Sequence, residues 1–219
     1  MDGSFGKINF NLDSSNMKAA ITSFPRQINE SFQIIENWSP INKYSNIQKI
    51  LILGMGGSAI GGDVAKVIVQ EECSVPIIIN RSYTIPSWVD DKTLVLASSY
   101  SGNTEETLNA FKLCREKKCQ IIILSTGGKL GEYSMEMGLD WITIPDGYQP
   151  RAALGFSFTL LVLLLRYLGL ISNTIISSLK NSTIPLEKFQ SIISKPNNIA
   201  LEIASQIHCT CPIIYGSED

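Results

Sequence analysis

Five short apolar stretches, rich in β-branched residues, follow one another between residues 47 and 145. None of them alternates cleanly between apolar and polar positions, which is typical of strands covered on both faces in a parallel sheet. The predicted strands span residues 47–54, 75–80, 93–99, 120–125 and 140–145.

Segments with helical character separate these predicted strands. Residues 59–70 and 105–118 follow the first and third strands, and a shorter segment, 86–91, lies between the second and third. Strands and helices in near-regular succession predict an α/β fold, a doubly wound five-stranded parallel sheet flanked by helices. Ligands of such sheets bind at the carboxyl ends of the strands, in the loops that open the following helices.

Further apolar patterns lie on either side of the predicted sheet. Apolar residues recur every three or four positions over 17–38, which predicts a helix kinked or broken at Pro25. Residues 156–165 are almost entirely apolar and predict a helix that is buried on all sides or has one face against a partner. A polar stretch, 172–195, precedes a helix-like segment, 198–207, and a strand-like end, 212–217, that resembles the first strand.

These patterns divide the chain into three expected parts. The first is an N-terminal helical segment, 1–46, and the second is the α/β domain, 47–170. The third, 171–219, is expected to hold a linker, a helix and the first strand of a second, incomplete domain.

Composition and charge narrow the classes of partner. The 219 residues are 44% hydrophobic with a formal net charge of −2, so the chain has no electrostatic footprint for nucleic acid or an anionic membrane. The apolar stretch 156–165 is far short of the ~20 residues that a bilayer span requires, and the N-terminus has no secretory or transit pattern. The five cysteines include no C-x-x-C pair, so we expect reduced, mostly buried thiols, no metal site and a cytoplasmic protein.

The loop after the first predicted strand is rich in glycine and opens a helix. Residues 54–59 satisfy the dinucleotide fingerprint G-x-G-x-x-A, but Asn80 and Arg81 stand where that fingerprint expects an acidic residue. Arg81 would suit a 2′-phosphate, so an NADP-binding domain stays open as a remote alternative. A triphosphate loop is disfavoured because Asp63 and Val64 replace its lysine and hydroxyl residue. Gly56, Gly57 and Ser58 form an anion cradle at a helix start, whereas Gly61 and Gly62 are explained by packing.

The loop after the third predicted strand is rich in hydroxyl groups. A capped helix start, with Asn103 as N-cap and Glu106 three residues later, explains part of it. Such a cap leaves Ser99, Ser101 and Thr104 unexplained. Neutral hydroxyls and backbone N–H groups at a helix start suit a phosphate monoester better than a polyphosphate, so we expect a small phosphorylated metabolite as ligand.

Together these motifs resemble the SIS, or sugar isomerase, family, whose mark is an S-x-S-G-x-T loop after a strand, here 99–104. The similarity is closest to the branch of bifunctional phosphoglucose/phosphomannose isomerases. It is carried by "GMGGSAIGGD" at 54–63, "SYSGNTEET" at 99–107, "STGGKL" at 125–130, "PRAALGFSF" at 150–158 and the tail 198–217.

This resemblance implies a function and a set of site residues. The sugar phosphate would be held by Gly56, Gly57, Ser58, Ser99, Ser101 and Thr104, and no cofactor or metal is implied. The implied reaction interconverts glucose 6-phosphate, and mannose 6-phosphate in this branch, with fructose 6-phosphate through a cis-enediolate. Arg151 matches the family arginine near the reacting carbons and would stabilise the enediolate, unless it is only a surface ion-pair partner. The branch usually forms homodimers.

The same resemblance implies that the catalytic set is incomplete. The family's glutamate base and ring-opening histidine belong to a second domain, beyond the strand that 212–217 resembles. His208, the only histidine, precedes that strand and is expected to be structural. The chain is therefore expected to be a truncated isomerase. The alternative is a non-catalytic module that binds a sugar phosphate and acts as a sensor or subunit.

Overall fold

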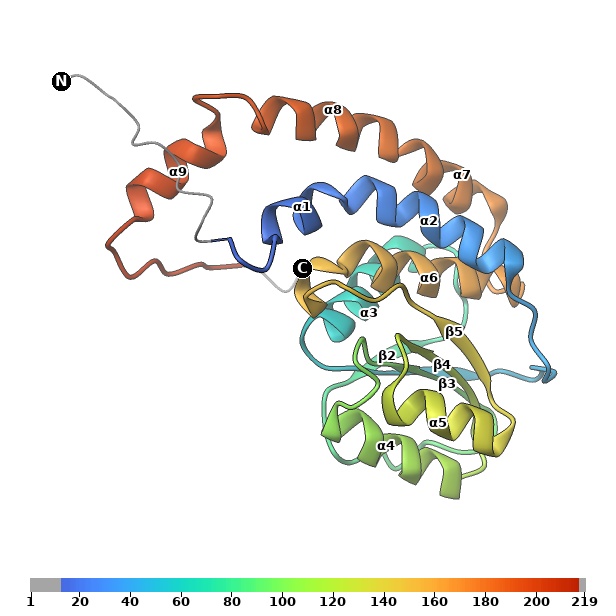
Figure 1. The fold of residues 1–219 in the computed structure, drawn as a ribbon. Helices are drawn as coiled ribbons and strands as arrows, with labels where there is room; N and C mark the ends of the chain where they lie inside the picture. The colour runs from blue at the N-terminus through green and yellow to red at the C-terminus, as the bar shows by residue number, and fades with distance from the viewer. Residues whose placement is uncertain (1–12, 217–219) are drawn as a thin grey trace.

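A five-stranded parallel sheet forms the centre of the protein (Figure 1). The structure is a computed structural model and describes residues 13–216. The sheet has the order β2-β1-β3-β4-β5, so the predicted doubly wound sheet is confirmed. Its strands are β1 (Lys49–Leu53), β2 (Ile77–Asn80), β3 (Thr93–Ser98), β4 (Gln120–Ser125) and β5 (Asp140–Thr143).

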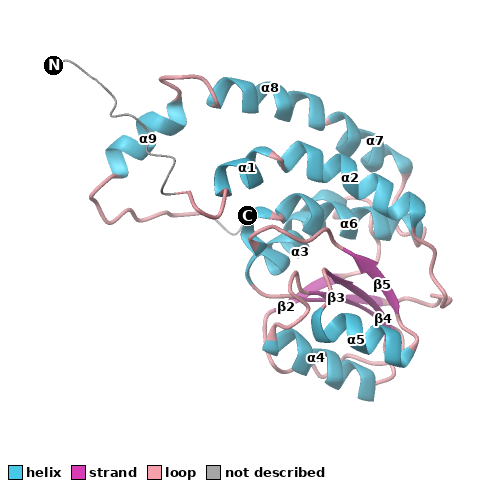
Figure 2. Cartoon of the chain, in the orientation of Figure 1, coloured by secondary structure: helices cyan, strands magenta, loops and turns pink. Residues whose placement is uncertain are grey.

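Helices cover both faces of the sheet (Figure 2). One face carries α4 (Glu105–Glu116) and α5 (Gly128–Met137), and the other carries α3 (Gly56–Val69) and α6 (Leu154–Tyr167). Outside α6 lies α2 (Phe24–Asn37), and α8 (Thr183–Ile193) packs in turn on α2. The remaining helices are α1 (Met17–Thr22), α7 (Asn173–Asn181) and α9 (Ile199–Ile207).

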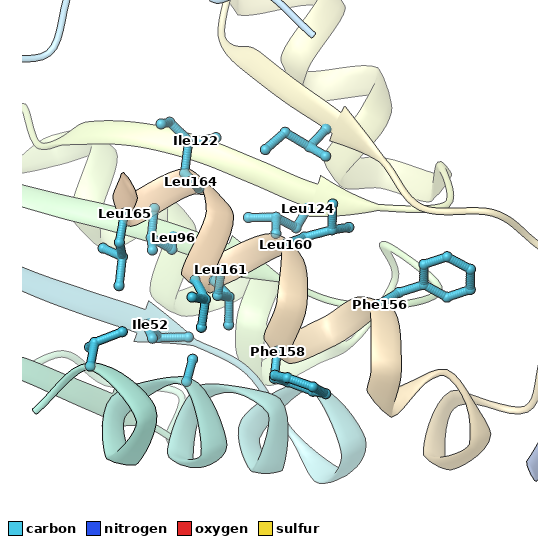
Figure 3. Packing of buried hydrophobic residues seen from close by; sticks show 14 of the residues in the cluster. Ile52, Leu96, Ile122, Leu124, Phe156, Phe158, Leu160, Leu161, Leu164 and Leu165 are labelled. Carbon is cyan, nitrogen blue, oxygen red and sulfur yellow. The ribbon is translucent and has the colours of Figure 1, made fainter. Parts of the chain in front are cut away.

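The apolar helix α6 is the centre of the larger core cluster (Figure 3). Every residue from 155 to 165 is buried. Leucines of α6 lie against the sheet residues Ile52, Leu96, Ile122 and Leu124, while α3 and α2 cover the rest of the helix. Burial on all sides within one domain is therefore confirmed, and no partner is needed to explain it. No helix within residues 13–216 is long and apolar enough to cross a bilayer.

The predicted break near Pro25 is confirmed. Helix α1 ends at Thr22, and α2 begins at Phe24 with Pro25 in its first turn, where a missing N–H costs no helical hydrogen bond.

The buried carboxylate of Asp140 ties the segment between α2 and β1 to the edge strand β5. It accepts hydrogen bonds from the backbone N–H groups of Ile41 and Asn42 at 2.6 and 3.1 Å, from the Asn42 amide at 3.0 Å and from the Tyr44 hydroxyl at 2.5 Å. Burial, followed by this hydrogen bond to Asp140, raises the pKa of Tyr44 above its usual range.

Several expectations about secondary structure were wrong. The polar stretch 172–195 forms α7 and α8, because Ile175, Ile176, Leu179 and Leu186 recur at helical spacing and pack against the core. Helix α5 was not anticipated, since two glycines open it and its apolar positions are few. Segment 86–91 forms turns, not a helix.

The C-terminal expectations and the cysteines also differ from the structure in part. Residues 212–216 are exposed and form no strand, because no neighbouring strand pairs with them in the described part of the chain; residue 217 lies outside it. The predicted helix near 198–207 is confirmed as α9, although it has no buried residue. Cys114 and Cys119 are buried thiols as expected, but Cys209 and Cys211 are exposed, and all five are free.

Candidate functional site at the carboxyl edge of the sheet

Three glycine-containing loops open helices at the carboxyl edge of the sheet. They connect β1 to α3, β3 to α4 and β4 to α5. Strands β1 and β3 are neighbours, with Leu53 opposite Ala97, so the loops that follow them leave the sheet side by side. The amino ends of three helices thus begin at one edge, and each end carries partial positive charge and N–H groups free of intrahelical bonds.

In the β3–α4 loop, two of the predicted hydroxyl residues lie together. The hydroxyl oxygens of Ser99 and Thr104 are 2.8 Å apart, with Ser99 buried and Thr104 at the N-cap position of α4. Ser101 is exposed, and its hydroxyl oxygen accepts a hydrogen bond from the N–H of Asn103 at 3.2 Å. The loop therefore holds a partly buried hydroxyl pair and one exposed hydroxyl on a tight turn.

The predicted capping box at Asn103 is wrong. Helix α4 begins at Glu105, and no side chain caps its first turn. The side-chain oxygen of Asn103 instead accepts from the N–H of Lys129 at 3.0 Å, in the first turn of α5. Asn103 thus caps a neighbouring helix, which local sequence spacing does not reveal, and the hydroxyls of this loop are not needed as caps for α4.

The β3–α4 and β4–α5 loops are joined along their backbones. Thr126 N–H donates to the carbonyl of Tyr100 at 2.9 Å, and Leu130 N–H donates to the carbonyl of Gly102 at 3.1 Å. Gly102 has a φ of +68° and lies directly on the backbone of Gly127, so any side chain there would collide with it. These contacts hold the hydroxyl loop in one conformation.

In the β1–α3 loop, Gly56, Gly57 and Ser58 form the first turn of α3, and no side chain caps that turn. A Cβ on Gly57 would lie 2.8 Å from the carbonyl oxygen of Pro150 and 3.3 Å from Cα of Arg151. The structure therefore brings the backbone of Arg151 to the glycine-rich turn. Ser58 is buried.

Gly61 and Gly62, further along α3, serve packing as predicted. A Cβ on Gly61 would lie 2.6 Å from Cβ of Ser157 in α6, and one on Gly62 would meet Ile79 and Ile52. The close approach of α3 to α6 places the first turn of α3 beside the segment that carries Arg151.

Arg151 lies in the 3-10 turn η2 (Pro150–Ala152) and has an exposed side chain. Its alternative role as a surface ion-pair partner is not seen: in residues 13–216, the ion pairs join Arg26 to Glu30, Lys49 to Asp90 and Arg81 to Asp63. Arg81, the residue that kept the NADP alternative open, is held by Asp63 of α3.

Tyr83, which sequence reasoning did not single out, forms part of the rim of this edge together with Glu105. The Tyr83 hydroxyl donates to the Glu105 carboxylate at 3.2 Å, and Asn109 donates to the Tyr83 carbonyl at 2.8 Å. Partial burial and then the charges of Glu105 and Glu106 raise the pKa of Tyr83. The described residues contain no cluster of His, Cys, Asp or Glu that could hold a metal.

Comparisons with known proteins agree with this fold. No protein-family model matches the chain. A bifunctional phosphoglucose/phosphomannose isomerase of Caldicellulosiruptor bescii is 43% identical over 203 residues, which are 91% of this chain and 60% of that protein. A D-glucosamine-6-phosphate 4-epimerase of Sulfolobus acidocaldarius is 35% identical over 172 residues, 78% of this chain and 52% of that protein.

A solved structure shares the fold at low sequence identity. The tagatose-6-phosphate ketose/aldose isomerase of Escherichia coli matches with a TM-score of 0.56 and 13% identity, over 81% of this chain and 55% of that one. The chain thus spans about half to three fifths of the length of these proteins.

The five-stranded parallel sheet with helices on both faces defines an α/β domain whose fold this solved structure shares. Relatives of the chain are named bifunctional phosphoglucose/phosphomannose isomerases, which bears out its resemblance to that branch of the SIS, or sugar isomerase, family.

Proposed function

We propose that this chain is the sugar-phosphate-binding part of an isomerase that interconverts glucose 6-phosphate or mannose 6-phosphate with fructose 6-phosphate. The observation that carries the proposal is the hydroxyl pair of Ser99 and Thr104 at the start of α4, beside the uncapped first turn of α3. Hydroxyls and free N–H groups at helix starts match the roughly two negative charges of a phosphate monoester. The names of the relatives support this substrate class.

In the proposed site, each motif has one task. Gly56, Gly57 and Ser58 hold the substrate from one side, and the β3–α4 hydroxyls hold its phosphate from the other. Arg151, whose backbone lies beside Gly57, would direct its guanidinium toward the negative charge that develops on the enediolate oxygens as a proton moves between C1 and C2. No cofactor takes part in this proposal.

We place the base that moves this proton outside the present chain. The relatives are longer, and the chain matches about three fifths of the most similar one reported above. His208 does not fill the role of ring-opening acid in this proposal: it is the exposed C-cap residue of α9. A homodimer stays a prediction, which sedimentation velocity would test.

A second candidate reaction is epimerisation. One relative is named as a D-glucosamine-6-phosphate 4-epimerase, so its named substrate is a hexosamine phosphate. The same phosphate loops would serve either reaction, so the choice depends on the groups around the sugar ring.

Binding of glucose 6-phosphate to this chain, measured by isothermal titration calorimetry, tests the proposed site. Ser101→Ala combined with Thr104→Val should weaken binding by about 30-fold, because each lost neutral hydrogen bond costs about 1 kcal/mol. Ser177→Ala with Thr174→Val is the matched control, since both residues are exposed on α7. Unchanged affinity in the first variant would remove the loop from the site.

Turnover separates the candidate functions. Glucose 6-phosphate incubated with the protein and followed by appearance of fructose 6-phosphate reports isomerase activity. Binding without turnover, both by this chain and by a longer protein that contains it, would favour the non-catalytic module. Conversion of glucosamine 6-phosphate to its 4-epimer would favour the epimerase.

A further inference from the structure

We propose that Gln27 is a positioning residue for Arg151, an inference that rests on the proposed function. Gln27 lies in α2, more than a hundred residues away from Arg151 in the sequence, and its side chain is completely buried. No sequence motif connects the two residues; their relation exists only in the folded protein.

The amide of Gln27 holds the backbone immediately after Arg151 at two points. Its nitrogen donates to the carbonyl of Ala152 at 2.7 Å, and its oxygen accepts from the N–H of Gly155 at 3.0 Å. The first group belongs to η2, the turn that carries Arg151, and the second belongs to the first turn of α6. One planar amide therefore spans the corner at which η2 passes into α6.

Both backbone groups need such a partner. An N–H in the first turn of a helix has no intrahelical acceptor, and a buried polar group without a partner is costly. Ala152, Ala153 and Gly155 are all buried, so water does not take this place readily. The amide of Gln27 supplies what a capping side chain would supply at an exposed helix start.

Gly155 makes the close approach possible. A Cβ at this position would lie 2.7 Å from both Cβ and the side-chain oxygen of Gln27. The amide is also fixed from its own side, because its nitrogen lies 3.0 Å from the hydroxyl of Ser23 and 3.3 Å from the carbonyl of Ala20. These contacts fix the side-chain amide of Gln27 in one position, and the amide in turn fixes the backbone between η2 and α6.

The neighbouring residue on α2 holds the other side of the same segment. Arg26 donates to the Tyr148 hydroxyl at 2.8 Å, and the Tyr148 N–H donates to the hydroxyl of Tyr100 at 2.9 Å. Tyr100 belongs to the hydroxyl loop after β3. Helix α2 therefore clamps the chain on both sides of Arg151 and connects this clamp to the phosphate loop.

The test compares two ligands that differ in their need for Arg151. In 5-phosphoarabinonate, a carboxylate stands where the enediolate oxygens would form, whereas inorganic phosphate occupies only the phosphate loops. Gln27→Glu keeps the acceptor for Gly155 but loses the donor to Ala152. We expect this variant to bind 5-phosphoarabinonate about tenfold more weakly and to bind inorganic phosphate with unchanged affinity. A tenfold effect is typical of the coupling between residues in one hydrogen-bond network.

A double-mutant cycle with Arg151→Ala shows whether the effect passes through Arg151. In the Arg151→Ala background, Gln27→Glu should cause no further loss of 5-phosphoarabinonate binding. Two results would show that Gln27 only stabilises the fold. In the first, Gln27→Glu weakens the binding of both ligands equally. In the second, the loss of affinity in the double variant is the product of the losses in the two single variants. If Gln27→Glu is unfolded by circular dichroism, Gly155→Ala, whose methyl group displaces the Gln27 amide, must give the same pattern.

The proposed function and this inference fail in different ways. If the unmodified chain binds neither ligand, the proposed function is wrong. If it binds both and Gln27→Glu binds both equally well, the phosphate site stands and the positioning role of Gln27 is refuted.

Discussion

The contact between α3 and α6 gives a sharp prediction for Gly61→Ala. A methyl group at this position would lie 2.6 Å from Cβ of Ser157 and 3.1 Å from the Ser157 carbonyl carbon. Optimal separations between carbon atoms are about 3.5–4.0 Å, so the helices would have to move apart by roughly 1 Å. Helix α6 has little room to retreat, because the sheet and α2 enclose it.

Two opposing effects set the expected change in the free energy of unfolding for Gly61→Ala. Overpacking of this kind costs about 1–3 kcal/mol, while replacing a glycine inside a helix by alanine returns about 1 kcal/mol. Gly62→Ala is the matched control, since it gains the same helix propensity in the same turn. Its methyl group would meet only side-chain atoms of Ile79 and Ile52, at 3.1 and 3.2 Å, which can shift. Gly61→Ala should therefore be about 2 kcal/mol less stable than Gly62→Ala.

Urea unfolding followed by circular dichroism measures this difference directly. For a chain of this length, about 2 kcal/mol corresponds to a thermal midpoint roughly 4–8 °C lower. The variant should also weaken glucose 6-phosphate binding, since the same contact holds Gly57 beside Arg151. If Gly61→Ala proves as stable as Gly62→Ala, the close packing of α3 on α6 described here is incorrect.

Three further predictions concern other contacts. Asp140→Ala should lower the free energy of unfolding by about 3 kcal/mol in urea titrations, because several donors between α2 and β1 lose a charged acceptor; a loss below about 1 kcal/mol would contradict this. Asn103→Ala should lower the free energy of unfolding by about 1 kcal/mol, because it removes the cap of α5. If the variant loses no more stability than an alanine substitution at another exposed position, Asn103 is not a cap. The Lys49 ammonium holds the pKa of Asp90 below its usual range through a 2.7 Å hydrogen bond. The pair therefore stabilises the fold above about pH 4, and its contribution falls as the pH drops through the lowered pKa. The stability difference between the natural chain and Lys49→Met should shrink from pH 6 to pH 3, and a difference that grows would refute this sign.

Local sequence patterns predicted those parts of the fold whose cause is local. The three central strands β1, β3 and β4 were predictable because their apolar side chains are buried on both faces, which leaves a continuous apolar signal. The break at Pro25 follows from the missing backbone N–H of proline. Helix α7 was missed because serine and asparagine dilute its apolar spacing, and only its packing on the core reveals it.

The candidate site divides in the same way. Its glycines and hydroxyl residues could be found from the sequence, because a helix start that receives a phosphate needs small residues and donors within a few positions. The role of Asn103 was misread, because its partner Lys129 is distant in sequence and adjacent only in the folded chain.

The sequence by itself determined the parallel sheet and the helix-opening loops, since each depends on residues within one short segment. It also predicts the chemical class of ligand that these loops suit. Only the tertiary structure decided that Arg151 lies against Gly57, that Asn103 caps α5 and that Gln27 holds the turn carrying Arg151. These are contacts between segments whose meeting depends on how whole helices pack on the sheet.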